Sequence, residues 1–191
     1  MKTWRNPLTT MVGALALSLG GTASATPAQI IFLRHAEKPA DGAELNERGW
    51  ERAKALATLF THDPRALEHG PAAVVFAMKP VKAGDSVRAI QTMEATVRAL
   101  KVKLDRRYSR DEIDELVRAL LKSKAGDGKT IIVCWEHKLF PDMLKALGWT
   151  SGPKKWDDDV YDRLWVLDFA DGKPTRFRDL PQKLLSGDSE K

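Results

Sequence analysis

Cysteine is nearly absent from this 191-residue chain, which contains only Cys134. A single cysteine cannot form an internal disulfide, a zinc knuckle or a Cys-x-x-Cys redox pair. The four histidines have neither the His-Glu-x-x-His nor the His-x-His spacing of common metal sites. No apolar run reaches the roughly 18 residues that a membrane-spanning helix needs. The sequence therefore predicts no metal site and no integral membrane segment.

A strong charge of one sign is also missing. Thirty-one lysines and arginines stand against 26 acidic residues, which gives a formal net charge of +5. Lys2 and Arg5 lie in a segment that we expect to be removed, and subtracting these two charges leaves +3. That excess is too weak to indicate a nucleic-acid partner, so none is predicted.

The N-terminus has the pattern of an export signal. Lys2 and Arg5 are followed by the apolar run Met11–Leu19, and Ala23–Ala25 offers small residues at both positions that a signal peptidase reads. The apolar run is too short to span a bilayer. We therefore expect residues 1–25 to be a cleaved signal peptide and the protein to be periplasmic or secreted. A hydrophobic leader that is not cleaved is the alternative.

The remaining chain alternates strand patterns with helix patterns. Apolar, β-branched runs predict strands over 29–33, 73–77, 130–135 and 163–169. Strands that alternate with helices favour a mostly parallel sheet with helices on both faces. We therefore predict one three-layer α/β domain over residues 26–180 and a polar C-terminal tail over residues 181–191, of which residues 186–191 are expected to fray.

The starts and ends of the helices carry their own signals. Asn46 and Ser86 are candidate N-caps, and Ser109 with Glu112 has the pattern of a capping box. Gly148 is expected just past the end of the last helix. The apolar face expected for the first helix consists of Trp50, Ala53, Leu56 and Phe60.

Two arginines and two histidines are expected to meet at one edge of the sheet. Arg34 and His35 directly follow the first strand, and His137 follows the strand over 130–135. Arg88 lies in the first turn of the helix after the second strand. Ligands of parallel α/β sheets bind beyond the carboxyl ends of the strands. Arginine forks match phosphate oxygens, and nearby cations keep a histidine neutral and nucleophilic. The group therefore predicts a phosphoryl-transfer site.

The order of these motifs resembles the histidine phosphatase superfamily. The run Ile31–Lys38 (IFLRHAEK) resembles the leading motif of that family, and Leu45–Gly49 (LNERG) resembles its next segment. Arg88–Thr92 (RAIQT) is similar to the RAxQT motif, and 131–137 is similar to the strand of the second histidine. The matches extend from about residue 30 to residue 148.

The resemblance implies a phosphoglycerate mutase-like fold and a phosphohistidine intermediate. By resemblance His35 becomes phosphorylated, and Arg34, Arg88 and His137 surround the phosphoryl group. No metal and no cofactor are implied. In-line transfer to a neutral imidazole needs mainly positioning and positive charge, which these four residues can supply.

The proton donor is not fixed by any motif. Lys138 follows the second histidine, where one branch of the family has an aspartate, and Asp105, Asp111 and Glu112 are the candidates where another branch has a glutamate. Glu136 precedes His137, but alternation along a strand predicts that it points to the opposite face.

Three functions are consistent with the sequence. The preferred one is an exported phosphatase that hydrolyses a phosphorylated small molecule or envelope component through phosphohistidine at His35. A phosphohistidine-protein phosphatase is the second, because its substrates carry a good leaving group and need less acid catalysis. A non-catalytic protein that binds a phosphorylated ligand is the third.

Overall fold

The computed structural model describes residue 1 and residues 26–190 of the chain. The signal peptide expected over residues 1–25 therefore lies, apart from Met1, outside the described residues. The strands are β1 (Gln29–Arg34), β2 (Ala72–Ala77), β3 (Leu104–Asp105), β4 (Thr130–Trp135), β5 (Arg163–Ala170) and β6 (Lys173–Pro181). The helices are α1 (Glu47–His62), α2 (Arg88–Leu100), α3 (Ile113–Leu121), the 3-10 turn η1 (His137–Leu139) and α4 (Phe140–Ala146).

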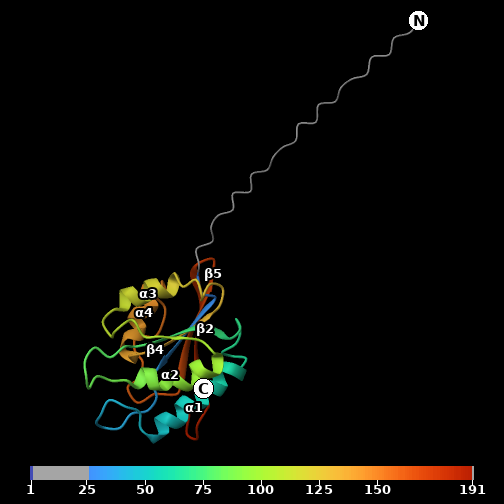
Figure 1. The fold of residues 1–191 in the computed structure, drawn as a ribbon. Helices are drawn as coiled ribbons and strands as arrows, with labels where there is room; N and C mark the ends of the chain where they lie inside the picture. The colour runs from blue at the N-terminus through green and yellow to red at the C-terminus, as the bar shows by residue number, and fades with distance from the viewer. Residues whose placement is uncertain (2–25, 191) are drawn as a thin grey trace.

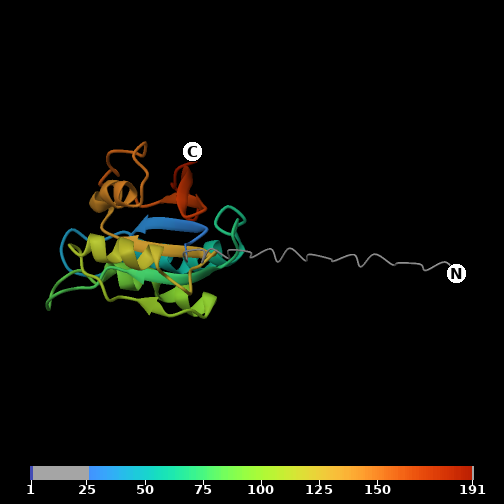
Figure 2. The ribbon, with the colours of Figure 1, turned by 90° about the horizontal axis from the view of Figure 1, so that it is seen from above.

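The strands form one six-stranded sheet in the order β3-β2-β4-β1-β5-β6. β1 to β4 run parallel, whereas β5 is antiparallel to β1 and β6 is antiparallel to β5. The predicted mostly parallel sheet is confirmed (Figures 1 and 2). β3 and β6 were not predicted, because β3 has two residues and β6 is an edge strand with no buried position.

Helices cover both faces of the sheet, as the three-layer prediction requires (Figure 1). Ile30 and Phe32 of β1 pack toward α3 and α4, while Ile31 and Leu33 pack in the core that includes α1 and α2. This alternation follows from the period of two in a strand, with both faces buried. Among the described residues, no helix is long and apolar enough to cross a membrane.

The helix ends follow the sequence signals in part. The side chain of Asn46 caps α1 by accepting the amide of Gly49 at 2.8 Å, as predicted. Gly148 has a left-handed φ of 92° just past α4, which is also confirmed. α2 begins at Arg88 rather than directly after Ser86. α3 begins at Ile113, whereas Ser109 lies in a bridge with Lys79 and donates to Glu112 from both its amide and its hydroxyl.

Trp50 does not belong to the buried face of α1, which corrects the prediction for this helix. The residue is 43% exposed, whereas Arg52 is 2% exposed. The other three predicted positions of that face, Ala53, Leu56 and Phe60, are buried. The buried face begins at Gly49 and continues every three or four residues, so Trp50 lies to one side of it.

The C-terminal segment is docked on the domain, contrary to the expectation that it frays. Gln182 is 1% exposed, and its backbone N–H donates to the carbonyl of Asp162 at 2.7 Å. The side chain of Asp188 is 3% exposed and bonds to Arg52 in α1. The chain therefore ends against α1 (Figure 1). Residue 191 lies outside the described residues.

Candidate active site

His35 and Ala36 extend from the end of β1 and are held by two helices. Thr92 of α2 accepts the amide of Ala36 at 2.9 Å and donates to the carbonyl of Arg88 at 2.7 Å. On the other side, the backbone of Glu37 lies so close to α1 that a Cβ at Gly49 would be 2.2 Å from the Glu37 carbonyl oxygen. This contact requires glycine.

His35 presents one free ring nitrogen in its neutral form. Its Nδ1 lies 2.7 Å from the carbonyl oxygen of Ala36, and a carbonyl can only accept, so Nδ1 carries the proton and Nε2 the lone pair. Burial, followed by the charges of Arg34 and Arg88, lowers the pKa of His35 to about 4. Nε2 therefore keeps its lone pair at neutral pH, which is the state that a nucleophilic imidazole needs.

Arg34 lies beneath the loop over 157–162, between α4 and β5. Its Nη1 donates to the carbonyls of Asp158 at 2.5 Å and Val160 at 2.9 Å. Its guanidinium carbon lies 3.9 Å from the centroid of the Tyr161 ring, which is a cation-π contact. The charge of Arg34 is thus fixed beside His35, and the ring of Tyr161 lies 6.1 Å from that of His35.

Arg88 uses its planar fork to organise another loop. Its Nε donates to the carbonyl of Glu44 at 3.0 Å, and its Nη2 donates to the carbonyl of Gly42. Gln91, one turn along α2, accepts the amide of Leu45 at 3.0 Å. The positive charge of Arg88 contributes to the low pKa of His35, so these two predicted residues lie close enough to interact.

His137 lies between two carboxylates. Its Nε2 is 2.8 Å from Oδ1 of Asp158, and its Nδ1 is 3.2 Å from Oε1 of Glu136. Only the contact with Asp158 has the geometry of a hydrogen bond, because Nδ1 is buried without a hydrogen-bond partner among the described residues. The contact with His137 lowers the pKa of Glu136 to about 2.

Glu136 lies in the site rather than on the opposite face, which corrects the prediction from strand alternation. β4 ends at Trp135, so the period of two no longer applies one residue later. The negative charge of Glu136 favours the protonated forms of Arg34 and His35, so it opposes the lowering of their pKa values by burial. The four predicted residues Arg34, His35, Arg88 and His137 therefore share one electrostatic environment with an unpredicted carboxylate.

Trp156 anchors the loop that covers Arg34. It packs against Phe140 and Trp165 with ring centroids 5.3 and 5.0 Å away, and its indole NH donates to Val160 at 2.8 Å. A cavity of about 480 Å³ opens beside this loop and Lys138. No sequence signal linked Asp158, two residues after Trp156, to His137.

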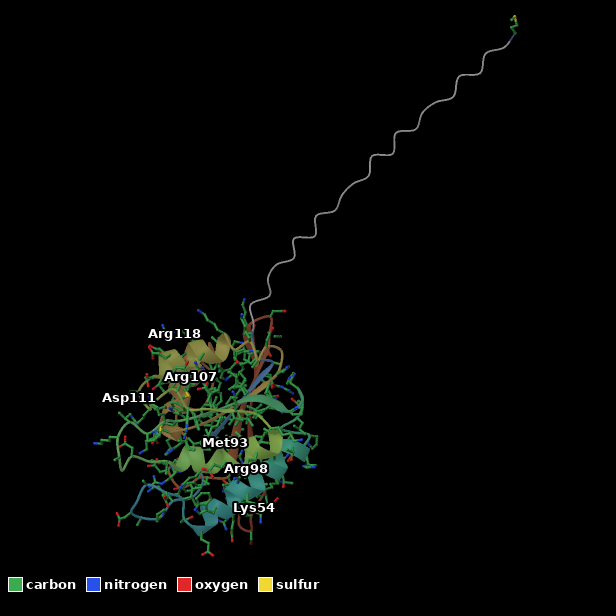
Figure 3. The ribbon with its side chains drawn as sticks, in the orientation of Figure 1. Lys54, Met93, Arg98, Arg107, Asp111 and Arg118 are labelled. Carbon is green, nitrogen blue, oxygen red and sulfur yellow. The ribbon has the colours of Figure 1, made fainter. Side chains whose placement is uncertain are left out.

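The three predicted proton donors are each engaged with a neighbour. Asp105 pairs with Arg107 and belongs to β3, three strands and about 14 Å from β1. Asp111 is exposed and pairs with Arg110, and Figure 3 shows it at the periphery of the molecule. Glu112 accepts the amide and hydroxyl of Ser109, and these bonds lower its pKa. The structure does not bring Asp105 to His35, and a donor role for Asp111 or Glu112 stays a prediction.

One cluster in the described part of the chain has metal-ligand atoms close together, namely Glu68, His69 and Asp168. Both carboxylates are already paired with Arg176 and Arg178. Two guanidinium groups oppose a further cation at this place. His69 and His62 are both exposed.

The arrangement is suited to transfer of a phosphoryl group. Nε2 of His35 supplies an electron pair, and the nearby arginines supply fixed positive charge. Such positioning and charge are the main requirements of phosphoryl transfer.

No family model and no curated protein matches the sequence. Solved structures, in contrast, are similar to it along most of their length. The protein histidine phosphatase SixA complexed with tungstate is 15% identical with a TM-score of 0.53, covering 81% of this chain and 97% of that chain. Phosphoglycerate mutase from Bacillus anthracis str. Sterne is 15% identical with a TM-score of 0.52, covering 80% and 92%.

A phosphoserine phosphatase from Entamoeba histolytica, in complex with 3-phosphoglyceric acid, is 14% identical with a TM-score of 0.52. The similarity covers 82% of this chain and 99% of that chain. At identities this low the structural similarity shows the fold alone, which is the predicted phosphoglycerate mutase-like fold.

Proposed function

We propose that this chain, which has the histidine phosphatase fold, is a metal-independent phosphatase that forms phosphohistidine at Nε2 of His35. The observation that carries the proposal is the neutral, buried imidazole of His35 beside Arg34 and Arg88. A phosphorylated small molecule or envelope component is the proposed substrate.

The proposed reaction has two steps. Nε2 of His35 attacks phosphorus in line, the new N–P bond forms, and the bond from phosphorus to the leaving oxygen breaks with its electron pair. A proton from water or an acid completes the alcohol. Water then attacks phosphorus, the N–P bond breaks, and inorganic phosphate leaves while His35 regains its lone pair. Arg34 and Arg88 stabilise the charge on the phosphoryl oxygens in both steps.

A His35→Ala variant tests the nucleophile. Wild-type protein mixed briefly with labelled phosphomonoester should carry acid-labile, base-stable phosphate, and His35→Ala should carry none and lose nearly all turnover. His69→Ala is the matched control, and this variant should retain activity because His69 is exposed. Wild-type activity should also survive exhaustive chelation. Full turnover in folded His35→Ala, or strong loss on chelation, contradicts the proposal.

A phosphohistidine-protein phosphatase is the second candidate. The ionised state of Glu136 near neutral pH favours it, because this carboxylate has no proton to give to an alkoxide. Phosphohistidine has a better leaving group and needs less acid help. Faster hydrolysis of a phosphohistidine-containing protein than of any phosphomonoester in a broad panel would select this candidate.

We further propose that the protein acts outside the cytoplasm. The proposal rests on the signal-peptide pattern of residues 1–25. Intact-mass analysis of protein recovered from an exporting host should show a chain that begins near Thr26. Soluble protein that retains the leader would contradict cleavage.

A further inference from the structure

One guanidinium joins the C-terminal segment, residues 182–189, to the backbone that carries His35. Arg52 donates to Glu37 from Nε at 3.0 Å and from Nη2 at 2.8 Å. It also donates to Asp188 from Nη1 at 2.9 Å and from Nη2 at 2.7 Å. All three side chains are largely buried. Glu37 follows His35 by two residues, so the end of the chain is linked to the nucleophile segment.

The same segment holds the loop over 157–162. Gln182 donates from its side chain to the carbonyl of Tyr161 at 3.1 Å, and from its backbone to the carbonyl of Asp162. The ring of Tyr161 lies against the guanidinium of Arg34. The loop therefore connects Gln182 to a second group of the candidate site.

Asp188 also fixes the shape of the segment. Its Oδ2 accepts the amides of Leu184 and Leu185 at 2.9 and 3.1 Å, which closes a turn. Leu184 packs against the core on the α1 side. Arg48 adds a hydrogen bond to the carbonyl of Ser186 at 2.9 Å. These contacts give the segment one defined position on the domain.

We propose that residues 182–189 form a positioning element of the active site, with Asp188 and Gln182 as its positioning residues. Asp188 acts through Arg52 on Glu37, and Gln182 acts on the loop that covers Arg34. Together they fix the distance between the nucleophile and the groups around the phosphoryl position. The inference rests on the proposed phosphatase function, because its kinetic readout is phosphoryl transfer.

Placement matters for this chemistry because a misplacement of about 1 Å can cost on the order of 100-fold in rate. The segment after β1 and the loop over 157–162 lie on different parts of the chain. A polar cavity of about 400 Å³ lies between them and is lined by Glu37, Arg52, Tyr161 and Asp188 among others. Loss of the Asp188 charge should therefore let the two parts move relative to each other.

Asp168 provides a matched control for Asp188. Its side chain is 6% exposed and accepts from Arg176 and Arg178, as that of Asp188 accepts from Arg52 and Arg48. Asp168 lies opposite Gln29, at the start of β1 and therefore at the far end of the strand from His35. It has the same chemistry without the connection to the site.

The kinetic test compares Asp188→Asn with Asp168→Asn in the full chain. Both variants should melt at lower temperature than wild type, because each removes a buried carboxylate charge that is shared by two arginines. Well below both melting temperatures, Asp188→Asn should lower kcat about tenfold with less change in KM, and Asp168→Asn should leave kcat near that of wild type. Equal kcat in the three proteins, or equal losses in both variants, overturns the proposal.

Hydrogen exchange gives a readout that does not depend on turnover. Asp188→Asn should accelerate amide exchange in residues 36–46 and 157–162, and Asp168→Asn should not. If wild type hydrolyses no phosphorylated compound but this exchange pattern is found, the proposed function fails and the positioning of the loops stands. Unchanged exchange in Asp188→Asn overturns the positioning role whatever the activity.

Discussion

Asp158 places a carboxylate oxygen 2.8 Å from Nε2 of His137. The same carboxylate lies 3.6 Å from Nζ of Lys138. Asp158 is 67% exposed at its side chain, so a ligand can displace it without opening the core. Under the proposed function, the carboxylate of Asp158 would compete with the phosphoryl oxygens of the substrate for contact with His137 and Lys138.

Asp158→Asn should therefore strengthen the binding of oxyanions. Removing the charge eliminates repulsion with the ligand and weakens the competing bond to His137. Because an exposed ion pair is weak, we expect a modest decrease, about two- to fivefold, in the inhibition constant for tungstate. Asp157→Asn is the control, because its side chain pairs with Lys155 instead. Weaker tungstate binding in Asp158→Asn would show that Asp158 supports the site rather than competing with the ligand.

Arg88→Lys should lower kcat/KM by at least tenfold. Lysine keeps the charge but cannot bridge the carbonyls of Gly42 and Glu44 while facing a phosphoryl group. Arg98→Lys is the control, since Arg98 is exposed on the same helix. Equal catalytic efficiency in Arg88→Lys and wild type would remove Arg88 from the site.

The pH dependence of kcat/KM should reflect the low pKa of His35. Burial lowers this pKa to about 4 from an ordinary value of 6.5, so the free enzyme should keep its nucleophile down to about pH 4. A rate profile that falls below pH 6.5 with the titration of one group would contradict this prediction, provided that the substrate does not titrate there.

The same shift predicts a change in stability. Between pH 6.5 and pH 4 the unfolded chain binds more protons at His35 than the folded chain, so the free energy of unfolding should decrease as the pH falls. A shift of this size corresponds to about 3 kcal/mol. Glu136 and Asp188, with pKa values of about 2, lose their contribution mainly below pH 4.5. The free energy of unfolding, measured by denaturant melts between pH 4.5 and 6.5, should therefore decrease with falling pH more steeply in wild type than in His35→Gln.

Gly49→Ala should destabilise the protein, although alanine is the better helix former. In an ordinary helix interior the change stabilises by up to about 1 kcal/mol. Here the new Cβ would overlap the carbonyl oxygen of Glu37, so the backbone after His35 must move. We expect a lower melting temperature together with a lower kcat. A stabilised, fully active variant would show that the two segments are farther apart than this contact implies.

Single-turnover phosphorylation of His35 should slow steeply as the leaving group becomes poorer. Contacts with His137 lower the pKa of both Glu136 and Asp158, so neither holds a proton at neutral pH. Aryl phosphates should react far faster than alkyl phosphates. A flat dependence that is lost selectively in Asp111→Asn or Glu112→Gln would contradict the prediction and identify the donor.

Local sequence signals were sufficient for much of the framework. The β-branched runs located the four long central strands, and Asn46 and Gly148 marked helix ends, because each signal depends on neighbours within a few residues. The motif order also placed Arg34, His35, Arg88 and His137 at one edge of a parallel sheet. That edge follows from strand direction alone.

The contacts that complete the site depend on residues far apart in the sequence. Arg34 and Asp158 are separated by 124 positions, and Arg52 and Asp188 by 136. No periodicity or cap signal relates such positions, because their proximity results from the packing of the whole domain. The sequence by itself determined the four central strands, the helix ends at Asn46 and Gly148, and the predicted nucleophile. Only the tertiary structure decided that Asp158 contacts His137 and that the C-terminal segment is linked through Arg52 to the backbone after His35, because these residues meet only once the sheet and its loops are assembled.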